Sequence, residues 1–90
     1  MAAGLILEVA ESSLALDREH KGSLYARAGI ADYWIVNLVD RVLEVNREPV
    51  KDNSRPFAWR YARLQVLDAS ASVTPLAAPS ARIRVADLLP

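Results

Sequence analysis

The stretch LILEVAESSLALDREHKGSLYARAGIADYWIVN, residues 5–37, decides the fold. It begins with a nearly continuous apolar run over residues 5–10, which predicts a strand buried on both faces. It ends with aromatic and β-branched residues over 32–37, which predict a second strand. The longer segment between them is expected to form a helix, so the stretch predicts a strand–helix–strand unit.

The helix is expected to run from Leu16 or Asp17 to Ala28. Asp17 suits the positive end of the helix dipole, and Gly29 is a suitable residue to stop the last turn. Gly22 lies inside the helix, where glycine costs about 1 kcal/mol relative to alanine. We therefore expect close packing or a near approach of another backbone at Gly22.

The remainder of the chain predicts further strands and loops. In order these are a hairpin strand over 41–48, a loop over 49–56, a strand over 57–67, a surface segment over 68–81, and a short strand with a helical turn over 82–90. In the hairpin strand Glu44 and Asn46 alternate with apolar residues, so one face is expected to be wet. The whole chain, residues 1–90, is expected to form a single domain of the α/β (α+β mixed) class, a small mixed sheet with one main helix packed on it.

The composition limits the classes of protein and of binding site that are compatible with this chain. The 90 residues are 52% hydrophobic and 24% charged, which is typical of a globular domain. Eleven basic and eleven acidic residues cancel, so any contact with nucleic acid would need a local patch. The absence of cysteine excludes disulfides and thiolate metal sites. No apolar run approaches the roughly 20 residues of a membrane span, and no basic region precedes the first apolar run, so we expect no membrane contact and a cytoplasmic protein.

Glu8 is the acid inside the first apolar run. A buried unpaired carboxylate costs on the order of several kcal/mol, so either the sheet edge lets Glu8 reach water or a cation meets it. Asp17, Lys21 and Tyr25 lie at i, i+4 and i+8 and form one helical stripe. If the helix folds back over the sheet, Lys21 reaches Glu8.

Two interpretations of this juxtaposition stay open. The carboxylate could hold a divalent ion while the ammonium stabilises a negatively charged transition state. Alternatively, Glu8 and Lys21 form a structural ion pair, and Asp17 and Lys21 form an ordinary i,i+4 pair. Spacing alone favours the structural interpretation.

An ordered set of residues resembles the Uma-two family of restriction endonucleases, a branch of the PD-(D/E)XK nuclease superfamily. The matching positions are Glu8-Val9, Ser13, Asp17-Arg18, Lys21, Tyr25-Ala26, Ala28-Gly29-Ile30 and Tyr33-Trp34-Ile35-Val36. The later stretches RVLEVNREP and IRVADLLP are similar too, so the resemblance covers nearly the whole chain.

The resemblance implies a restriction-endonuclease-like core and metal-dependent hydrolysis of DNA phosphodiesters. Glu8 matches the acidic position that binds Mg²⁺ or a similar ion. Two residues later the superfamily usually has a lysine, but this chain has Ala10, and Lys21 on the helix takes that place. Tyr25 and Asp17 match positions lining the same cleft, where Asp17 could orient Lys21.

The chain departs from the family pattern upstream of Glu8. The family places a second acid, an Asp usually after a Pro, on a preceding strand, but none of the seven residues before Glu8 is acidic. Glu11 is the nearest spare carboxylate, and it lies past the end of the strand. The resemblance therefore predicts the C-terminal portion of the family domain, with the N-terminal part of the fold missing and Mg²⁺ bound weakly if at all.

Two functional alternatives follow from this departure. The first is a nuclease that is active only if another chain supplies the second acid. The second is a catalytically inactive remnant that acts as an oligomerising or binding module. Either alternative predicts a homo-oligomer, because the apolar residues near the start of the chain still need burial.

The remaining candidates have simpler interpretations. His20 is expected on the solvated helix surface, and Trp34 and Trp59 are expected to pack against the sheet. A local basic excess is best explained as a solvated face, with a strip that binds phosphates as the functional alternative. Its members are Arg47, Lys51, Arg55, Arg60 and Arg63.

Overall fold

A computed structural model describes residues 4–11 and 15–90, with the side chains of residues 15–17 excepted. Within these residues the chain forms one helix, a four-stranded sheet and a small two-stranded sheet, as expected for a mixed α+β fold. The elements are β1 (Ile6–Ala10), α1 (Ala15–Arg27), β2 (Asp32–Asn37), β3 (Val42–Lys51), β4 (Trp59–Leu67), β5 (Ser72–Val73), β6 (Ile83–Arg84) and the 3₁₀ turn η1 (Val85–Asp87).

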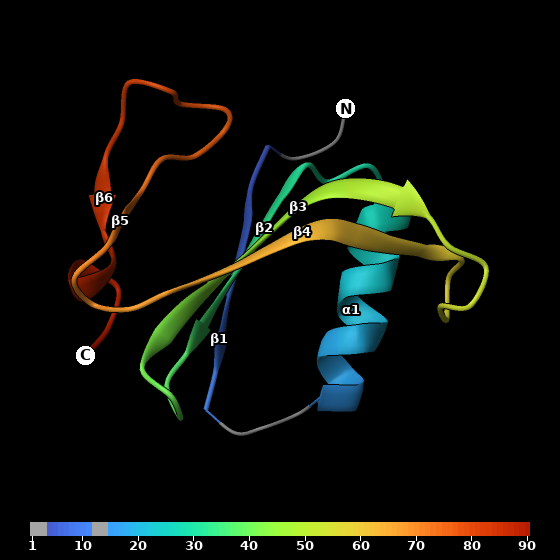
Figure 1. Ribbon diagram of the computed structural model, residues 1–90, viewed down its shortest axis with the longest axis horizontal. Coiled ribbons are helices and arrows are strands. Elements are labelled where there is room, and N and C mark those ends of the chain that lie inside the picture. Colours follow the sequence, from blue (N-terminus) through green and yellow to red (C-terminus); the bar gives the residue numbers. More distant parts are fainter. Residues whose placement is uncertain (1–3, 12–14) are drawn as a thin grey trace.

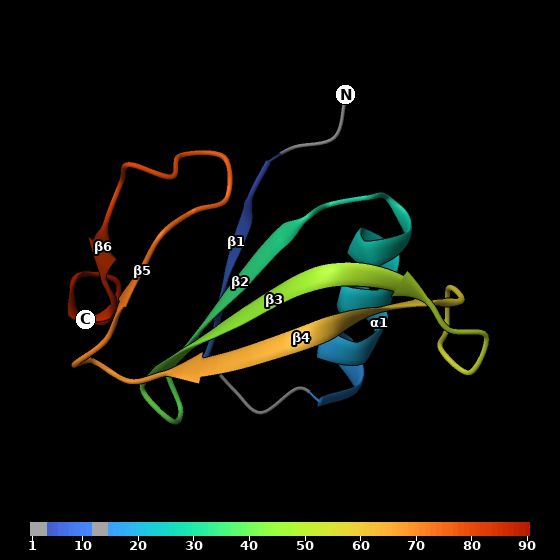
Figure 2. The same cartoon turned by 45° about the horizontal axis from the view of Figure 1, so that its top comes forward.

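The large sheet has the strand order β1-β2-β3-β4. β1 and β2 are parallel, which requires a crossover connection, and α1 provides it. β2, β3 and β4 are antiparallel neighbours, joined by short connections. In Figures 1 and 2 the four strands fan out from a steep β1 to a shallow β4, which is the usual twist of a sheet.

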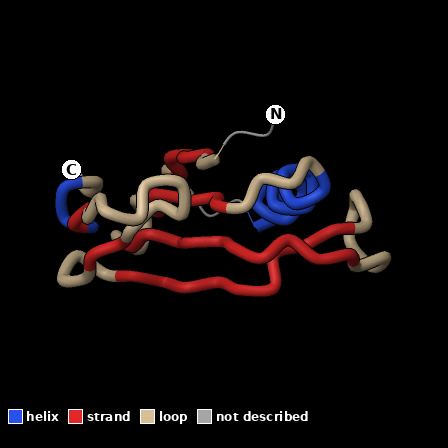
Figure 3. The backbone as a smooth tube through the Cα atoms, turned by 90° about the horizontal axis from the view of Figure 1, so that it is seen from above, coloured by secondary structure: helices blue, strands red, loops and turns tan. Residues whose placement is uncertain are grey.

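The sheet is covered on both faces, by different parts of the chain. Figure 1 shows α1 on one side of the strands and the segment of β5, β6 and η1 on the other, and Figure 3 shows them at opposite ends of the molecule. One buried hydrophobic cluster lies under the C-terminal segment. It consists of Trp34, Val36, Leu43 and Val45 from the sheet and Val73, Val85 and Leu89 from that segment.

The two glycines of the helical region have different roles. Gly29 adopts a φ of 78°, and the amide of Ile30 donates to the carbonyl of Tyr25 at 3.1 Å, while the amide of Gly29 donates to Ala26 at 3.1 Å. This pattern is a Schellman motif, so the expected helix stop is confirmed. At Gly22 an added Cβ would meet no heavy atom within 4 Å. The expectation of close packing there is therefore wrong, because Gly22 faces open space.

β1 is not buried on both faces as predicted. Its side chains alternate, with Leu7 47% and Val9 61% exposed. β1 has a neighbour on one side only within the described sheet, and the core under the C-terminal segment is built on β2 and β3. An apolar run at this edge therefore leaves one face uncovered.

β3 is longer than predicted and continues through Pro49, which the sequence assigned to a loop. Proline is tolerated in a strand where its missing N–H has no partner to meet. β2 begins at Asp32, opposite Arg47, so beyond Arg47 β3 has a partner strand on one side only. Pro49 pairs with Tyr61 in that region, which explains why the strand can continue.

The segment over 68–81 is also more ordered than a surface segment. Ser72 and Val73 form β5, which pairs with β6, and Val73 and Pro75 are buried. The predicted short strand and helical turn near the end of the chain are confirmed as β6 and η1.

Candidate functional site

Glu8 of the sheet and Lys21 of the helix are in direct contact. The Nζ atom of Lys21 donates to Oε2 of Glu8 at 2.8 Å, and the two side chains are 42% and 25% exposed. β1 places Glu8 on the face that α1 covers, and Lys21 reaches it although α1 packs chiefly against β3 and β4. The predicted contact is confirmed, and both expected explanations for Glu8 hold, since it lies on an edge strand and has a cation beside it.

The second carboxylate oxygen of Glu8 has a different environment. Oε1 is buried and has no hydrogen-bond partner among the described residues. A buried oxygen without a donor carries a desolvation cost of roughly 1–3 kcal/mol. Oε1 is therefore an acceptor open to a cation or to a hydrogen-bond donor.

Glu44 provides a second carboxylate on the same face of the sheet. Glu8 pairs with Ile35 of β2, which pairs with Glu44 of β3, so the two acids lie in one cross-strand row, two strands apart. Glu44 Oε2 accepts from Asn37 Nδ2 at 2.8 Å and lies 3.3 Å from Nη2 of Arg18. The wet face predicted for β3 is wrong at Glu44, which is buried because α1 covers it.

Tyr25 and Asp17 are the two other predicted site residues. Tyr25 is half-buried, and its ring packs edge-on against Tyr33, with 5.0 Å between the ring centroids. The side chain of Asp17, like Ser13, lies outside the described residues. Glu11 is exposed just past the end of β1. The described structure thus brings Glu8 and Lys21 into contact. Arg18 lies one turn before Lys21 on α1, and Glu44 lies in the same cross-strand row as Glu8.

Whether a divalent ion fits at Glu8 depends on the oxygen ligands that surround it. Mg²⁺ and Ca²⁺ prefer several oxygen ligands. Glu8 Oε1 suits one ligand position, but in the described parts of the chain no three His, Cys, Asp or Glu side chains are grouped closely enough to hold a metal ion. Glu8 is therefore a fitting single ligand, while the described residues do not form a complete divalent-ion site.

The predicted surface and packing residues are mostly confirmed. His20 is exposed, with its ring edge-on to Phe57 at 6.0 Å, and Trp34 is buried in the core. Trp59 is half-buried on β4, and Nζ of Lys51 lies 5.8 Å from its ring centroid. Arg47 departs from the predicted solvated basic face, because it forms an ion pair with a buried acid.

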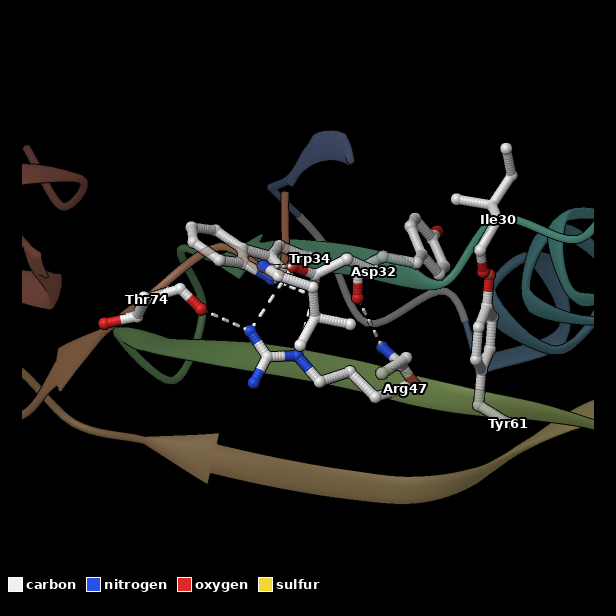
Figure 4. Close-up of polar contacts among 9 residues, drawn as sticks. Ile30, Asp32, Trp34, Arg47, Tyr61 and Thr74 are labelled. Carbon is white, nitrogen blue, oxygen red and sulfur yellow. Dashed lines mark hydrogen bonds and ion pairs between the residues drawn. The ribbon is translucent and has the colours of Figure 1, made fainter. Parts of the chain in front are cut away.

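That acid is Asp32, which sequence reasoning missed as a polar centre. Asp32 is fully buried and accepts from Trp34 Nε1 at 2.6 Å, Arg47 Nε at 2.9 Å and the amide of Leu76 at 3.0 Å. Arg47 also donates to the carbonyl of Thr74 at 2.7 Å (Figure 4). This network fastens the C-terminal segment to the sheet, and its only sequence signal was an acid at the start of a strand.

Tyr61 makes a second long-range polar contact. Its hydroxyl donates to the carbonyl of Ile30 at 2.7 Å, which joins β4 to the turn after α1 (Figure 4). Burial raises the pKa of Tyr61 above its usual value, and the charge of Asp32 adds to this effect.

The parallel β1–α1–β2 unit, the antiparallel extension of the sheet and the helix-facing Glu8–Lys21 pair are compatible with a restriction-endonuclease-like domain. Over residues 2–86 the sequence matches the Uma2 family, whose description is "Putative restriction endonuclease". The chain belongs to the Uma2 family, which confirms the resemblance and supports a nuclease-like function. A comparison with curated proteins found no match. No helix in the described parts of the chain is long and apolar enough to cross a membrane.

Proposed function

We propose that the Glu8–Lys21 pair is part of the active site of a metal-dependent DNA endonuclease. The observation that carries this proposal is the 2.8 Å contact between Lys21 and one oxygen of Glu8, with the other oxygen buried and without a donor. A purely structural ion pair would gain more by giving both carboxylate oxygens a donor. Membership of the Uma2 family supports DNA as the substrate.

The residues have distinct roles in this proposal. Glu8 holds the ion through its free oxygen, and Lys21 places a positive charge beside the scissile phosphate, where negative charge develops. Asp17 orients Lys21, and Tyr25 lines the same cleft. A bound Mg²⁺ or similar ion would supply an activated water for hydrolysis.

One carboxylate is a weak anchor for such an ion. Ligand charge sets the affinity of oxygen sites, so Glu8 by itself should bind Mg²⁺ only at roughly millimolar concentration or above. We infer that another chain supplies the second acid and that an isolated chain cleaves DNA slowly or not at all.

The alternative is a catalytically inactive module that oligomerises or binds a partner. The exposure of Leu7 and Val9 favours it, since both lie on β1 at the edge of the described sheet. An exposed apolar edge is a site of pairing with another chain. Assembly through this edge is also compatible with a nuclease whose second acid comes from its partner.

Cleavage of a labelled DNA duplex with Mg²⁺ or Mn²⁺ tests the proposal. Any cleavage should be lost in Glu8→Ala and in Lys21→Ala, while Glu48→Gln, which changes an exposed acid on β3, should cleave like the unaltered chain. Robust cleavage that survives Glu8→Ala would show that the active site lies elsewhere. An assembled protein with no cleavage at any metal concentration would favour the inactive module.

A further inference from the structure

A groove of about 190 Å³ lies where α1 approaches the paired ends of β3 and β4. Figure 1 shows these elements side by side, away from the C-terminal segment. The residues of its wall that matter here are Arg18, Gly22, Asn46, Arg55, Trp59 and Arg60. Small-molecule sites usually occupy about 300–1,000 Å³, so this groove suits one group of an extended ligand better than a whole cofactor.

The wall is rich in guanidinium groups. Arg18, Arg55 and Arg60 line the groove, together with a single carboxylate, Glu19. Arg55 and Arg60 share Asp52, which lies 3.5 Å from Nε of Arg55 and 3.0 Å from Nε of Arg60. Arg55 also faces Glu19, whose Oε1 lies 3.4 Å from Nη1, so two carboxylates contact Arg55 and one contacts Arg60. Each guanidinium has five N–H donors, so both arginines keep N–H donors for an anion.

Arg18 has a buried N–H donor that lacks an acceptor. Its Nη2 atom faces Glu44 at 3.3 Å, but its Nε atom is buried and has no hydrogen-bond partner among the described residues. Leaving a buried charged donor unpaired is costly, so a bound acceptor at this position would be stabilised. Arg18 also lies three residues before Lys21 on α1, which places the groove next to the Glu8–Lys21 pair.

The groove is held in shape and kept open. The amide of Phe57 donates to Oγ of Ser23 at 2.9 Å, and the guanidinium of Arg27 lies 4.7 Å from the Phe57 ring centroid. These contacts fix the connection that carries Arg55 against α1. Gly22 contributes no side chain, and an added Cβ would point into open space. The half-buried Trp59 supplies an aromatic surface in the wall.

We propose that this groove binds a backbone phosphate of DNA next to the phosphate that Lys21 contacts, with Arg18, Arg55 and Arg60 as its ligands. The identity of the ligand as DNA rests on the proposed nuclease function. The shared chemistry is a phosphate oxygen accepting from guanidinium donors, which a free phosphate could also provide.

Binding can be measured without cleavage. Fluorescence anisotropy of a labelled duplex in EDTA, at several NaCl concentrations, reports the dissociation constant and its salt dependence. Arg60→Gln should weaken binding roughly tenfold and lower the salt slope by about one ion. Arg18→Lys, which keeps the charge but removes Nε, should weaken it less. Arg84→Gln, which removes an arginine paired with Asp87 on the opposite side of the sheet, should leave binding unchanged.

Gly22 allows a second test that does not depend on losing an arginine. Gly22→Glu places a carboxylate in the groove on a helix that tolerates glutamate well, and it should weaken binding more than the neutral, equally large Gly22→Gln. Unaltered binding in Arg60→Gln and Gly22→Glu would overturn the proposal. Inorganic phosphate that binds in an Arg60-dependent way, beside duplex binding that Arg60→Gln leaves unaltered, would instead identify a site for free phosphate.

Different results would contradict the proposed phosphate groove and the proposed nuclease function. Duplex binding that depends on Arg60 and Gly22, without cleavage by any assembled form, would support the groove and contradict the nuclease. Cleavage that depends on Glu8 and Lys21, with Arg60→Gln and Gly22→Glu binding like the unaltered chain, would support the nuclease and overturn the groove.

Discussion

Lys21 of α1 donates to Glu8 of β1 at 2.8 Å, while the other oxygen of Glu8 stays buried without a donor. The pair therefore satisfies one carboxylate oxygen of the partly buried Glu8 and leaves the other without a partner. Residues that serve a reaction are often arranged at some cost to stability. The stability and activity of variants at Glu8 and Lys21 therefore test whether the pair is functional or structural.

We predict that Glu8→Gln and Lys21→Met each change the free energy of unfolding by less than about 1 kcal/mol, because Lys21 is well exposed and such pairs contribute little. Both variants should nevertheless remove any metal-dependent cleavage. Urea unfolding followed by circular dichroism, beside the cleavage assay, makes the comparison. A loss of roughly 3 kcal/mol or more in both variants would instead identify a structural ion pair.

Asp32→Asn should destabilise the fold by about 3–5 kcal/mol, because Arg47 would keep its buried charge without a counter-ion. The C-terminal segment should lose protection from proteolysis first, since Asp32 accepts from Leu76 and Arg47 donates to Thr74. Asp87→Asn, in an exposed ion pair with Arg84, is the matched control and should change stability by less than about 1 kcal/mol.

Gly22→Ala and Gly29→Ala should have opposite effects. At Gly22 the new Cβ meets open space, so the better helix propensity of alanine should stabilise the fold by roughly 0.5–1 kcal/mol. At Gly29 the φ of 78° strains an L-residue, so alanine should destabilise it by about 1–2 kcal/mol. Thermal unfolding of the two variants measures both signs, and a destabilised Gly22→Ala would contradict the open space seen there.

The pH dependence of stability should contain a contribution from Tyr61. Burial raises its pKa in the folded state, so above about pH 10 the unfolded chain releases this proton first. The contribution is therefore fully present below pH 10 and is lost as the pH rises further. Tyr61→Phe should cost about 1 kcal/mol at pH 8, from the lost hydrogen bond to Ile30, and should unfold with a shallower alkaline decline. An unchanged decline in that variant would assign the effect to other groups.

The exposed residues of β1 should mediate self-association. We expect the chain to be at least dimeric at micromolar concentration, and Leu7→Lys with Val9→Lys should shift it to the monomer. Val39→Lys, at an exposed apolar residue in the turn between β2 and β3, is the control and should leave the assembly unchanged. Sedimentation velocity reads out the mass; a cooperatively folding monomer of the unaltered chain would contradict this prediction.

Local patterns in the sequence were sufficient for the strand–helix–strand unit. The apolar run before α1, the glycine after it and the β-branched residues of β2 each act over a few residues, so their structural consequences appear in the sequence itself. The spacing of Glu8 and Lys21 also predicted their contact, because a helix that connects two parallel strands crosses one face of their sheet. The catalytic role assigned to the pair stays a prediction.

Other features depended on residues that are distant in the sequence. The continuation of β3 through Pro49 was decided by where β2 begins, and the burial of Glu44 by the position of Arg18 on the covering helix. The exposure of Leu7 and Val9 depended on which strands the C-terminal segment covers. No pattern within a single strand contains this information.

The sequence by itself thus determined the order of the elements apart from β5, the family of the chain and the meeting of Glu8 with Lys21. Only the tertiary structure decided that Asp32 joins Arg47 to the C-terminal segment and that three arginines surround one groove beside α1. The physical reason is that hydrogen bonds and ion pairs across layers depend on packing between distant segments, as with Asp32 and Leu76, which are 44 residues apart. Local propensity acts within a few neighbouring residues and cannot specify such contacts.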